Sequence, residues 1–468
     1  MTIVPAFAPR RLVKSKAASA FGHRNYRLFF AGQAVSLAGT WMQQVAQGWL
    51  VLTLTGDPFW LGVVASAQFL PVMVLGLFAG IVADVLPKRQ TLMAVQAVMM
   101  VLAVILAILT AAGIVQIWMI VVLALLLGCA NAVDMPVRQA FAIEMVGPRD
   151  IGNAVAINSA MFNGARVVGP ALAGLTIAAF GIATAFAINA LSFLAVLIAL
   201  WLMRDDDLHL ARLVPRPRSV AAVFDNLREG LSFVRHTPIV LLAVTTVGLT
   251  ATFGMNFQVV IPPLAQDALR SDASGYGFLM TASGLGALAA AVALVIGGRP
   301  KPGRIAIGAI VLGVASIALS MSTSYPISLL LMVPIGAGGI AMAATANATI
   351  QLAVPDGLRG RVMSVYTTVF SASMPIGGLL MGIIASSIGI LEAIAIGGVL
   401  SLITGLGAFV WYRRIRARPI AADAAESGAA EAGIAMASAP AAMPQSIEPS
   451  TSAAFNPPNP NEVLSTRR

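Results

Sequence analysis

Arg166 stands in the middle of a long apolar stretch, residues 152–178, in a chain of which only 10% is charged. Placing an arginine at the centre of a membrane-spanning helix costs about 3 kcal/mol even on a lenient insertion scale. Such a charge is expected to face a water-filled cavity or a partner group. Arg166 could therefore bind an anion or take part in a proton relay, or it could bond carbonyl groups freed around Gly169 and Pro170.

Asp134 and Arg138 form a second candidate proton or anion site, four residues apart at the end of the apolar stretch 115–134. This spacing favours a local ion pair on one helix face. A role in gating or proton handling stays equally open, because no other acid lies as deep in the first half of the chain. No Asp or Glu occupies the middle of an apolar stretch, so the residues themselves do not favour proton chemistry.

A polar stripe runs along the first apolar stretch, because Gln33, Thr40, Gln44 and Gln47 follow one another at spacings of seven, four and three. These spacings place the four side chains on one helix face. Polar side chains at membrane depth line a wet cavity or bond a neighbouring helix. Further candidates for the same cavity lie in other stretches: Trp41, Gln68, Asn163, Asn256 and Asn347. Helix bends or close packing are expected at Gly169, Pro170 and Pro375.

The apolar stretches that carry these residues are each long enough to cross a bilayer, which takes about 20 residues. Hydrophobic residues make up 58% of the chain and its mean hydropathy is +0.88. This composition excludes a soluble globular protein and predicts an all-α membrane protein. We expect twelve transmembrane helices, at 31–53, 60–84, 90–112, 115–134, 152–178, 181–203, 238–264, 274–297, 304–322, 326–350, 361–387 and 391–412.

Positive charge predicts the orientation of these helices. Of the 29 Lys and Arg residues, all but Arg166 and Arg270 fall in the N-terminal tail, the even-numbered loops or the C-terminal tail. The positive-inside rule then places both termini in the cytoplasm. We expect a multi-pass protein of a bacterial-type inner membrane. The net charge of +10 needs no nucleic-acid partner, since contact with the lipid bilayer accounts for it.

The chain divides into two halves of six spans. The expected parts are a basic tail (1–30), a first bundle (31–203), a cytosolic linker (204–237), a second bundle (238–412) and a disordered tail (413–468). The halves also repeat. Adding 208 to Gly169, Gly174 and Gly181 gives Gly377, Gly382 and Gly389, and adding 215 to Gly62, Pro87 and Arg89 gives Gly277, Pro302 and Arg304. Two repeats that meet at a central seam are typical of transporters.

The stretch from Gly80 through Asp84 to Lys88 and Arg89 resembles the loop 2–3 motif of the major facilitator superfamily, although Val85 and Pro87 depart from it. Other stretches resemble the drug-efflux branch that contains enterobactin exporters and macrolide pumps. They are residues 39–44, 49–55, 134–141, 163–170 and 359–364. The resemblance covers residues 20–412.

This resemblance implies two pseudo-symmetric six-helix bundles that rock about a central site and expose it to each side in turn. It also implies a latch on the cytoplasmic side. Gly80, Asp84, Lys88 and Arg89 would meet the start of the eleventh helix, near Arg359 and Arg361. The alternative is that these charges only anchor the topology. Coupling to protons is likewise implied by the resemblance alone.

Taken together, the patterns and the resemblance predict a secondary transporter that exports amphipathic small molecules, such as drugs or siderophore-like compounds. The resemblance implies that it works by proton antiport. A metabolite importer or facilitator and a lipid flippase stay open as alternatives. An enzyme is disfavoured, because the three histidines lie outside the spans and no metal cluster, nucleophile motif or phosphate-binding loop is present. We expect no cofactor, no metal and a monomer.

Overall fold

A computed structural model describes residues 16–209, 220–298 and 300–437, with side chains left out at 16–18, 77–84, 220–224 and 418–437. Residues up to Ile415 form one compact unit, and Arg416–Arg468 form another. The unit that ends at Ile415 contains the helices described below up to the first part of α13.

The described residues are almost entirely helical, and their turns fall where glycine and proline predict them. The α-helices are α1 (Arg24–Thr55), α2 (Pro58–Val85), α3 (Lys88–Ala111), α4 (Ile117–Phe180), α5 (Ile182–Trp201), α6 (Val220–His236), α7 (Pro238–Gly254), α8 (Phe257–Pro263), α9 (Ala273–Ile296), α10 (Gly303–Ser320), α11 (Tyr325–Ala353), α12 (Asp356–Ile388) and α13 (Ile390–Ala437). Three short helical turns join them: η1 (Lys16–Gly22), η2 (Asp205–Asp207) and η3 (Leu264–Ala268).

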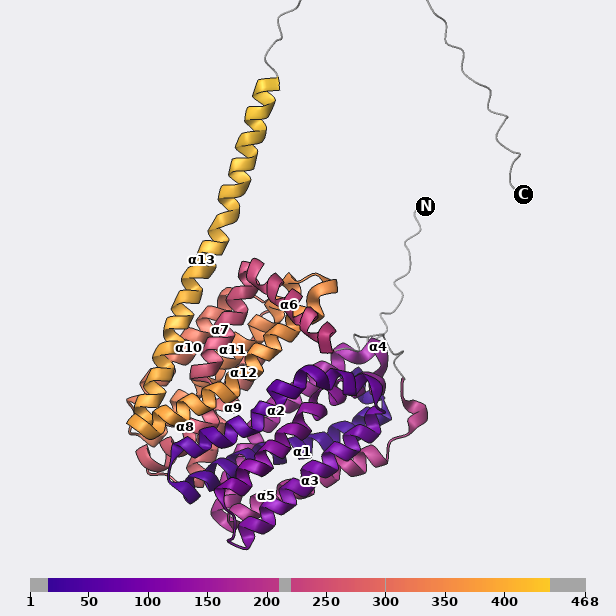
Figure 1. The fold of residues 1–468 in the computed structure, drawn as a ribbon, viewed down its shortest axis with the longest axis vertical. Coiled ribbons are helices and arrows are strands. Elements are labelled where there is room, and N and C mark those ends of the chain that lie inside the picture. The colour runs from indigo at the N-terminus through magenta and orange to yellow at the C-terminus, as the bar shows by residue number, and fades with distance from the viewer. Residues whose placement is uncertain (1–15, 210–219, 299, 438–468) are drawn as a thin grey trace, which may run out of the picture. The chain divides into compact units, whose positions relative to one another are not determined.

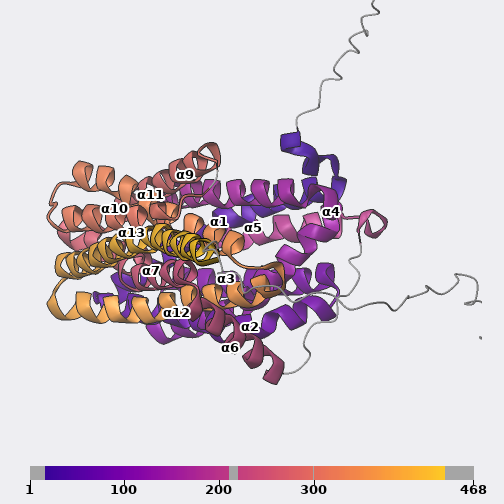
Figure 2. The same ribbon diagram turned by 90° about the horizontal axis from the view of Figure 1, so that it is seen from above.

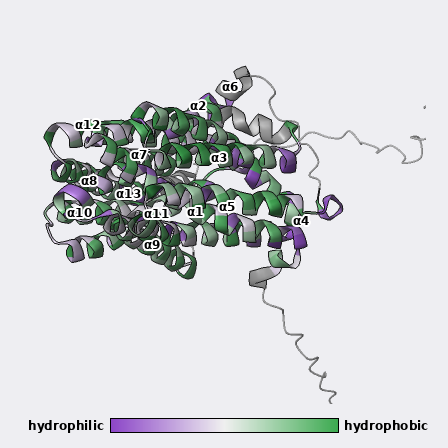
Figure 3. Cartoon of the chain, turned by 90° about the horizontal axis from the view of Figure 1, so that it is seen from below, coloured by the Kyte–Doolittle hydropathy of each residue, from purple (hydrophilic) through white to green (hydrophobic). Residues whose placement is uncertain are grey.

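Twelve spans follow from these helices. Ten helical segments in the described residues are long and apolar enough to cross a membrane. One of them, α4, is 64 residues long and contains two spans that meet at Gly147, where the backbone leaves the helical region (φ 69°, ψ 173°). Helix α1 adds the twelfth, since its 32 residues cross the same thickness but include the polar stripe. The expected all-α membrane fold is confirmed. Hydrophobic residues dominate the helices throughout (Figure 3).

The helices form two bundles, α1–α5 and α7–α13, which lie side by side (Figure 1). Between the bundles, α2 packs along α12 and α4 packs along α9. The linker helix α6 packs on α12 and α7 of the second bundle (Figure 2). We call the end of the bundles that holds the start of α1, the Gly147 elbow and the start of α12 the termini face, and the other end the far face.

The glycine repeat maps onto equivalent contacts in the two halves. A Cβ added to Gly62 of α2 would lie 2.5 Å from the Gly378 carbonyl oxygen of α12. At the equivalent residue of the second half, Gly277 of α9, a Cβ would lie 2.5 Å from the Pro170 carbonyl oxygen of α4. Only glycine lets helix backbones approach this closely. The sequence repeat therefore reflects two pseudo-symmetric helix crossings.

Three segments differ from the expected boundaries. Helix α4 continues past 134 to the Gly147 elbow, because Phe141 and Met145 are buried there and give the segment a core-facing side. The expected helix 238–264 is interrupted after Gly254, and the Asn256 side chain donates to the Thr252 carbonyl (2.6 Å) in place of a backbone amide.

The third difference concerns the tail expected to be disordered from 413. Helix α13 runs on to Ala437, and residues 438–468 lie outside the described part of the chain. The composition explains the difference. Alanine has the highest helix propensity of all residues, so an alanine-rich segment can form a helix without burying a core.

Candidate functional site: a seam between the bundles and the groups that line it

The seam between the two bundles is closed near the far face. Ser66 of α2 donates to the Pro375 carbonyl of α12 (2.7 Å), and Thr281 of α9 donates to the Val167 carbonyl of α4 (3.2 Å). Each of these groups lies in the part of its helix that is nearer the far face. Together with the two glycine crossings, they hold the bundles in contact on that side.

Aromatic rings add to the same seam. Trp49 of α1 stacks on Tyr276 of α9, with ring centroids 6.3 Å apart. The Tyr276 side chain is fully buried, and its hydroxyl has no hydrogen-bond partner among the described residues. A buried hydroxyl without a partner is unfavourable. Tyr276 therefore contributes to the seam through its ring.

The termini face has a different pattern, because each ion pair among its described side chains lies within one bundle or joins that bundle to the adjoining part of the linker. Lys88 pairs with Glu144 (2.8 Å), and Arg89 pairs with Asp205 (2.6 Å). Arg89 also donates to the carbonyls of Leu200 (2.8 Å) and Trp201. The basic pair of the expected latch is therefore bonded within the first half.

The second half holds its own latch residues in the same way. Arg359 pairs with Asp356 on its own helix (2.7 Å), and Arg361 pairs with Glu229 of the linker helix α6. The other two latch residues, Gly80 and Asp84, lie outside the residues whose side chains are described. The latch therefore stays a prediction.

Four carboxamide side chains meet at the seam, around a small cavity. Gln258 of α8 donates to Gln44 of α1 (2.9 Å), which joins the two halves. Gln47 and Gln68 also line the cavity, and they are 6% and 8% exposed. The cavity holds about 20 Å³, which is room for one water molecule. Because carboxamides both donate and accept hydrogen bonds, this site can bind neutral polar groups.

A charged and aromatic group lies on the adjoining helices. The Arg166 guanidinium lies over the Trp41 ring, 5.8 Å from its centroid, and the ring of Phe162 contacts the edge of Trp41 at 5.6 Å. Asn163 donates to the Ser159 carbonyl of its own helix (2.8 Å), and its carbonyl oxygen is buried without a partner. The structure thus brings Trp41 and Arg166 together, and their role in a substrate cavity stays a prediction.

Asp134 lies elsewhere, within the first bundle. It is 1% exposed, accepts a hydrogen bond from Gln96 of α3 (2.8 Å) and pairs with Arg138. The Arg138 Nε is buried without a partner. Both carboxylate oxygens are bonded, so the group is held as part of a compact polar network between α3 and α4.

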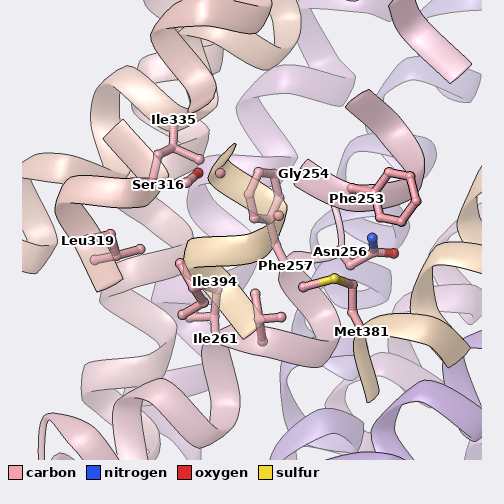
Figure 4. Close-up of a pocket in the computed structure, with 13 residues that line it drawn as sticks. Phe253, Gly254, Asn256, Phe257, Ile261, Ser316, Leu319, Ile335, Met381 and Ile394 are labelled. Atoms are coloured by element: carbon pink, nitrogen blue, oxygen red, sulfur yellow. The ribbon is translucent and has the colours of Figure 1, made fainter. Parts of the chain in front are cut away.

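Asn256 lines a second small cavity inside the second bundle, at the break between α7 and α8 (Figure 4). Aromatic and aliphatic side chains form most of its wall, among them Phe253, Phe257 and Met381. The Asn256 amide bonds the end of α7, so this residue maintains the helix break. Its expected part in a shared substrate cavity stays a prediction.

The remaining candidates are spread over the helices. Gln33 is 2% exposed, with an unpaired carbonyl oxygen, and Thr40 bonds its own helix at the Ser36 carbonyl. Asn347 accepts from Gln351 one turn later. A Cβ at Gly169 would clash with Trp41, so this glycine permits close packing of α4 on α1.

Several seam residues were not singled out from the sequence, notably Ser66, Tyr276 and Thr281. Serine and threonine bond their own helix backbone so often that they give no signal of a long-range partner. The tyrosine lies near the end of a span, where aromatic residues are common for other reasons. Only the three-dimensional crossing of the helices identifies them.

Residues 15–436 match the family described as transmembrane secretion effector. The chain belongs to this family of the major facilitator superfamily. The family and the relatives below are transporters rather than enzymes.

Its relatives among characterised proteins are bacterial. The chain is 28% identical to the multidrug efflux pump Tap of Mycolicibacterium fortuitum, over 75% of this chain and 87% of Tap. It is 26% identical to the staphyloferrin A transporter of Staphylococcus aureus, over 80% of this chain and 92% of that one. Macrolide efflux protein A of Streptococcus pyogenes is 22% identical, over 79% of this chain and 92% of that protein.

Solved structures share the fold. A peptide-complexed POT family transporter superposes with a TM-score of 0.69 at 12% identity and covers 86% of this chain and 100% of its own. A bacterial homologue of the lysosomal transporter Spinster, described as inward-facing and occupied, gives a TM-score of 0.62 at 15% identity, over 84% and 97%. Each similarity establishes the fold alone.

Proposed function

We propose that this transporter exports amphipathic small molecules, of the drug or siderophore-like kind, by alternating access coupled to proton antiport. The observation that carries the proposal is the asymmetry of the seam. Every contact between the bundles described above lies toward the far face, whereas the ion pairs at the termini face stay within one half. This asymmetry supports a state that opens toward the termini face, which the positive-inside rule assigns to the cytoplasm.

Export then requires a second state in which the seam opens and the termini face closes. In our proposal Gly80, Asp84, Lys88 and Arg89 meet the start of α12 in that state. Arg361 would leave Glu229 on closing. The Arg361–Glu229 side chains are 39% and 50% exposed, and an exposed pair contributes only about 0–1 kcal/mol, so exchanging its partner costs little.

The names of the relatives support the direction of transport, since two of the three are efflux proteins. Proton exchange would occur at Asp134, with Arg138 as its counter-charge. It is buried and bonded at the contact between α3 and α4, so a movement of one helix against the other would change its partners. A single chain holds both bundles, which fits a monomer.

Inverted membrane vesicles test this proposal. The vesicles are acidified inside and carry a pH-sensitive dye, and macrolides, siderophores and lipophilic dyes are added one at a time. We expect substrate-triggered proton efflux with the wild type, loss of the signal with Asp134→Asn and Asp84→Asn, and an unchanged signal with Arg270→Ala in an exposed far-face turn.

Two other outcomes would change the assignment. Uptake of a compound without proton movement would refute proton antiport and favour another ion or facilitated diffusion. No signal from any compound would refute export of this substrate class and favour the importer or the lipid flippase.

A further inference from the structure

Arg166 has no charge partner in the described part of the chain. No carboxylate of the described residues forms an ion pair with it, and its guanidinium donates no hydrogen bond. Its nitrogen atoms are also absent from the fully buried polar atoms that lack a partner, so they keep some accessible surface. Its five N–H donors therefore have no partner among the described residues, at the depth where an unpaired charge is most costly.

Aromatic rings border this cation on one side. Its one described contact is with the face of Trp41, at 5.8 Å, and Phe162 contacts the edge of the same ring. Phe162 precedes Arg166 by four residues, so both side chains lie on one face of α4. The Phe162 side chain is 47% exposed, which leaves its ring free to contact another molecule.

These groups specify a ligand by their chemistry. The planar guanidinium forms two parallel hydrogen bonds with a carboxylate and binds it more strongly than a neutral acceptor. The open ring of Phe162 and the edge of Trp41 favour an apolar, flat body next to that group. A cationic ligand would be repelled by Arg166 and would have to compete with it for the face of Trp41.

We propose that Arg166, Trp41 and Phe162 form the subsite that selects the anionic, aromatic end of the substrate. The proposal rests on the transport function above and gives that site a substrate class: amphipathic aromatic carboxylates and related planar anions. Binding of the anion supplies the partner that Arg166 lacks, so the cost of holding this charge in the membrane is offset when substrate is bound.

The subsite also touches the seam. A Cβ on Gly284 of α9 would lie 2.7 Å from the Arg166 carbonyl oxygen, and Thr281 bonds the carbonyl of the next residue, Val167. The backbone that carries the guanidinium is therefore part of the contact that must break when the far face opens. An anion bound here would be held beside the surface that moves.

Equilibrium binding to the purified full-length protein tests the subsite without any transport measurement. The probes are three compounds with one ring system: 1-naphthoate, the neutral 1-naphthamide and the cationic 1-naphthylmethylammonium. We expect the wild type to bind naphthoate at least about ten-fold more tightly than naphthamide, and the ammonium compound most weakly. Acetate and chloride serve as competitors and separate an aromatic-anion site from a general anion site.

Variants assign the effect to residues. Arg166→Gln should remove the preference for naphthoate while naphthamide binding stays the same, and Arg166→Lys should keep part of it. Trp41→Leu should weaken naphthoate and naphthamide together. Arg270→Gln, at a far-face turn, should change neither. If Arg166→Gln does not fold, Arg166→Lys and the comparison of the three probes on the wild type still test whether the site selects the anion.

Three results would overturn the inference: equal affinity for naphthoate and naphthamide, tighter binding of the ammonium compound, or competition by chloride as strong as by naphthoate. Each can occur while the vesicle assay still shows efflux of other compounds. In that case the export function stands and the subsite fails. Selective naphthoate binding without any transport would support the subsite and refute the export function.

Discussion

Adding one methyl group to Gly62 should open the far face of the transporter. At this residue a Cβ would lie 2.5 Å from the Gly378 carbonyl oxygen, so α2 and α12 must separate by roughly 0.8 Å to reach an ordinary C···O contact of about 3.3 Å. Overpacking of this kind costs about 1–3 kcal/mol. Because the clash exists only while the seam is closed, the closed state should lose about 5- to 150-fold in population.

Gly378→Ala is the matched control, since a Cβ there would make only ordinary van der Waals contacts, with Ala65 Cβ at 3.5 Å and with the Gly62 carbonyl oxygen and Ser66 Oγ at 3.7 Å. Spin labels on exposed far-face turns of the two bundles, placed by Ala112→Cys and Thr323→Cys in a Cys129→Ala background, report the separation by pulsed electron resonance. Gly62→Ala should move the distance distribution to longer values, and Gly378→Ala should leave it unchanged. Identical distributions for the two variants would refute the reasoning.

Three further predictions concern stability, each checked by thermal unfolding of the purified protein. Asp134→Asn should destabilise the protein by about 2 kcal/mol, less than the 3–5 kcal/mol of a fully buried pair because the Arg138 side chain is 25% exposed; an unchanged midpoint would contradict a tight network. Tyr276→Phe should be neutral or stabilising by up to about 1 kcal/mol, since the hydroxyl it removes has no partner. The Ser274 hydroxyl lowers the pKa of the Asp272 carboxyl below its usual 3.8. The stability that this hydrogen bond adds is therefore present above about pH 3.8 and is lost as the pH falls below it. In Asp272→Asn the unfolding midpoint should fall less steeply with decreasing pH than in the wild type.

The spans and their pseudo-symmetry could be predicted from the sequence because both depend on local or repeated features. Apolar stretches of membrane length predict helices directly. The sequence repeat relates Gly62 to Gly277, and in the structure both glycines lie at helix crossings. What the repeat could not give was the partner of each glycine, since the contacts join helices of opposite halves.

The candidate site was predictable only in part, for a similar reason. Periodicity placed Gln44 and Gln47 on one face of α1, and both line the carboxamide cavity. It could not show that Asn256 closes a helix end, because that depends on the interruption after Gly254. Nor could it show that Glu229 pairs with Arg361, because the linker helix is docked by tertiary packing.

The chemistry of the far-face seam has a consequence for the conditions under which it works. Its described contacts are glycine backbones, hydroxyls such as that of Ser66, stacked rings and the Gln44–Gln258 carboxamides, none of which changes charge near neutral pH. Salt screens charges and has little effect on such contacts. In the proposed orientation the far face is the outer barrier, and we expect it to hold equally well in acid, neutral, dilute or saline surroundings. Any sensitivity of transport to pH or salt would then come from the termini face or from the cavity.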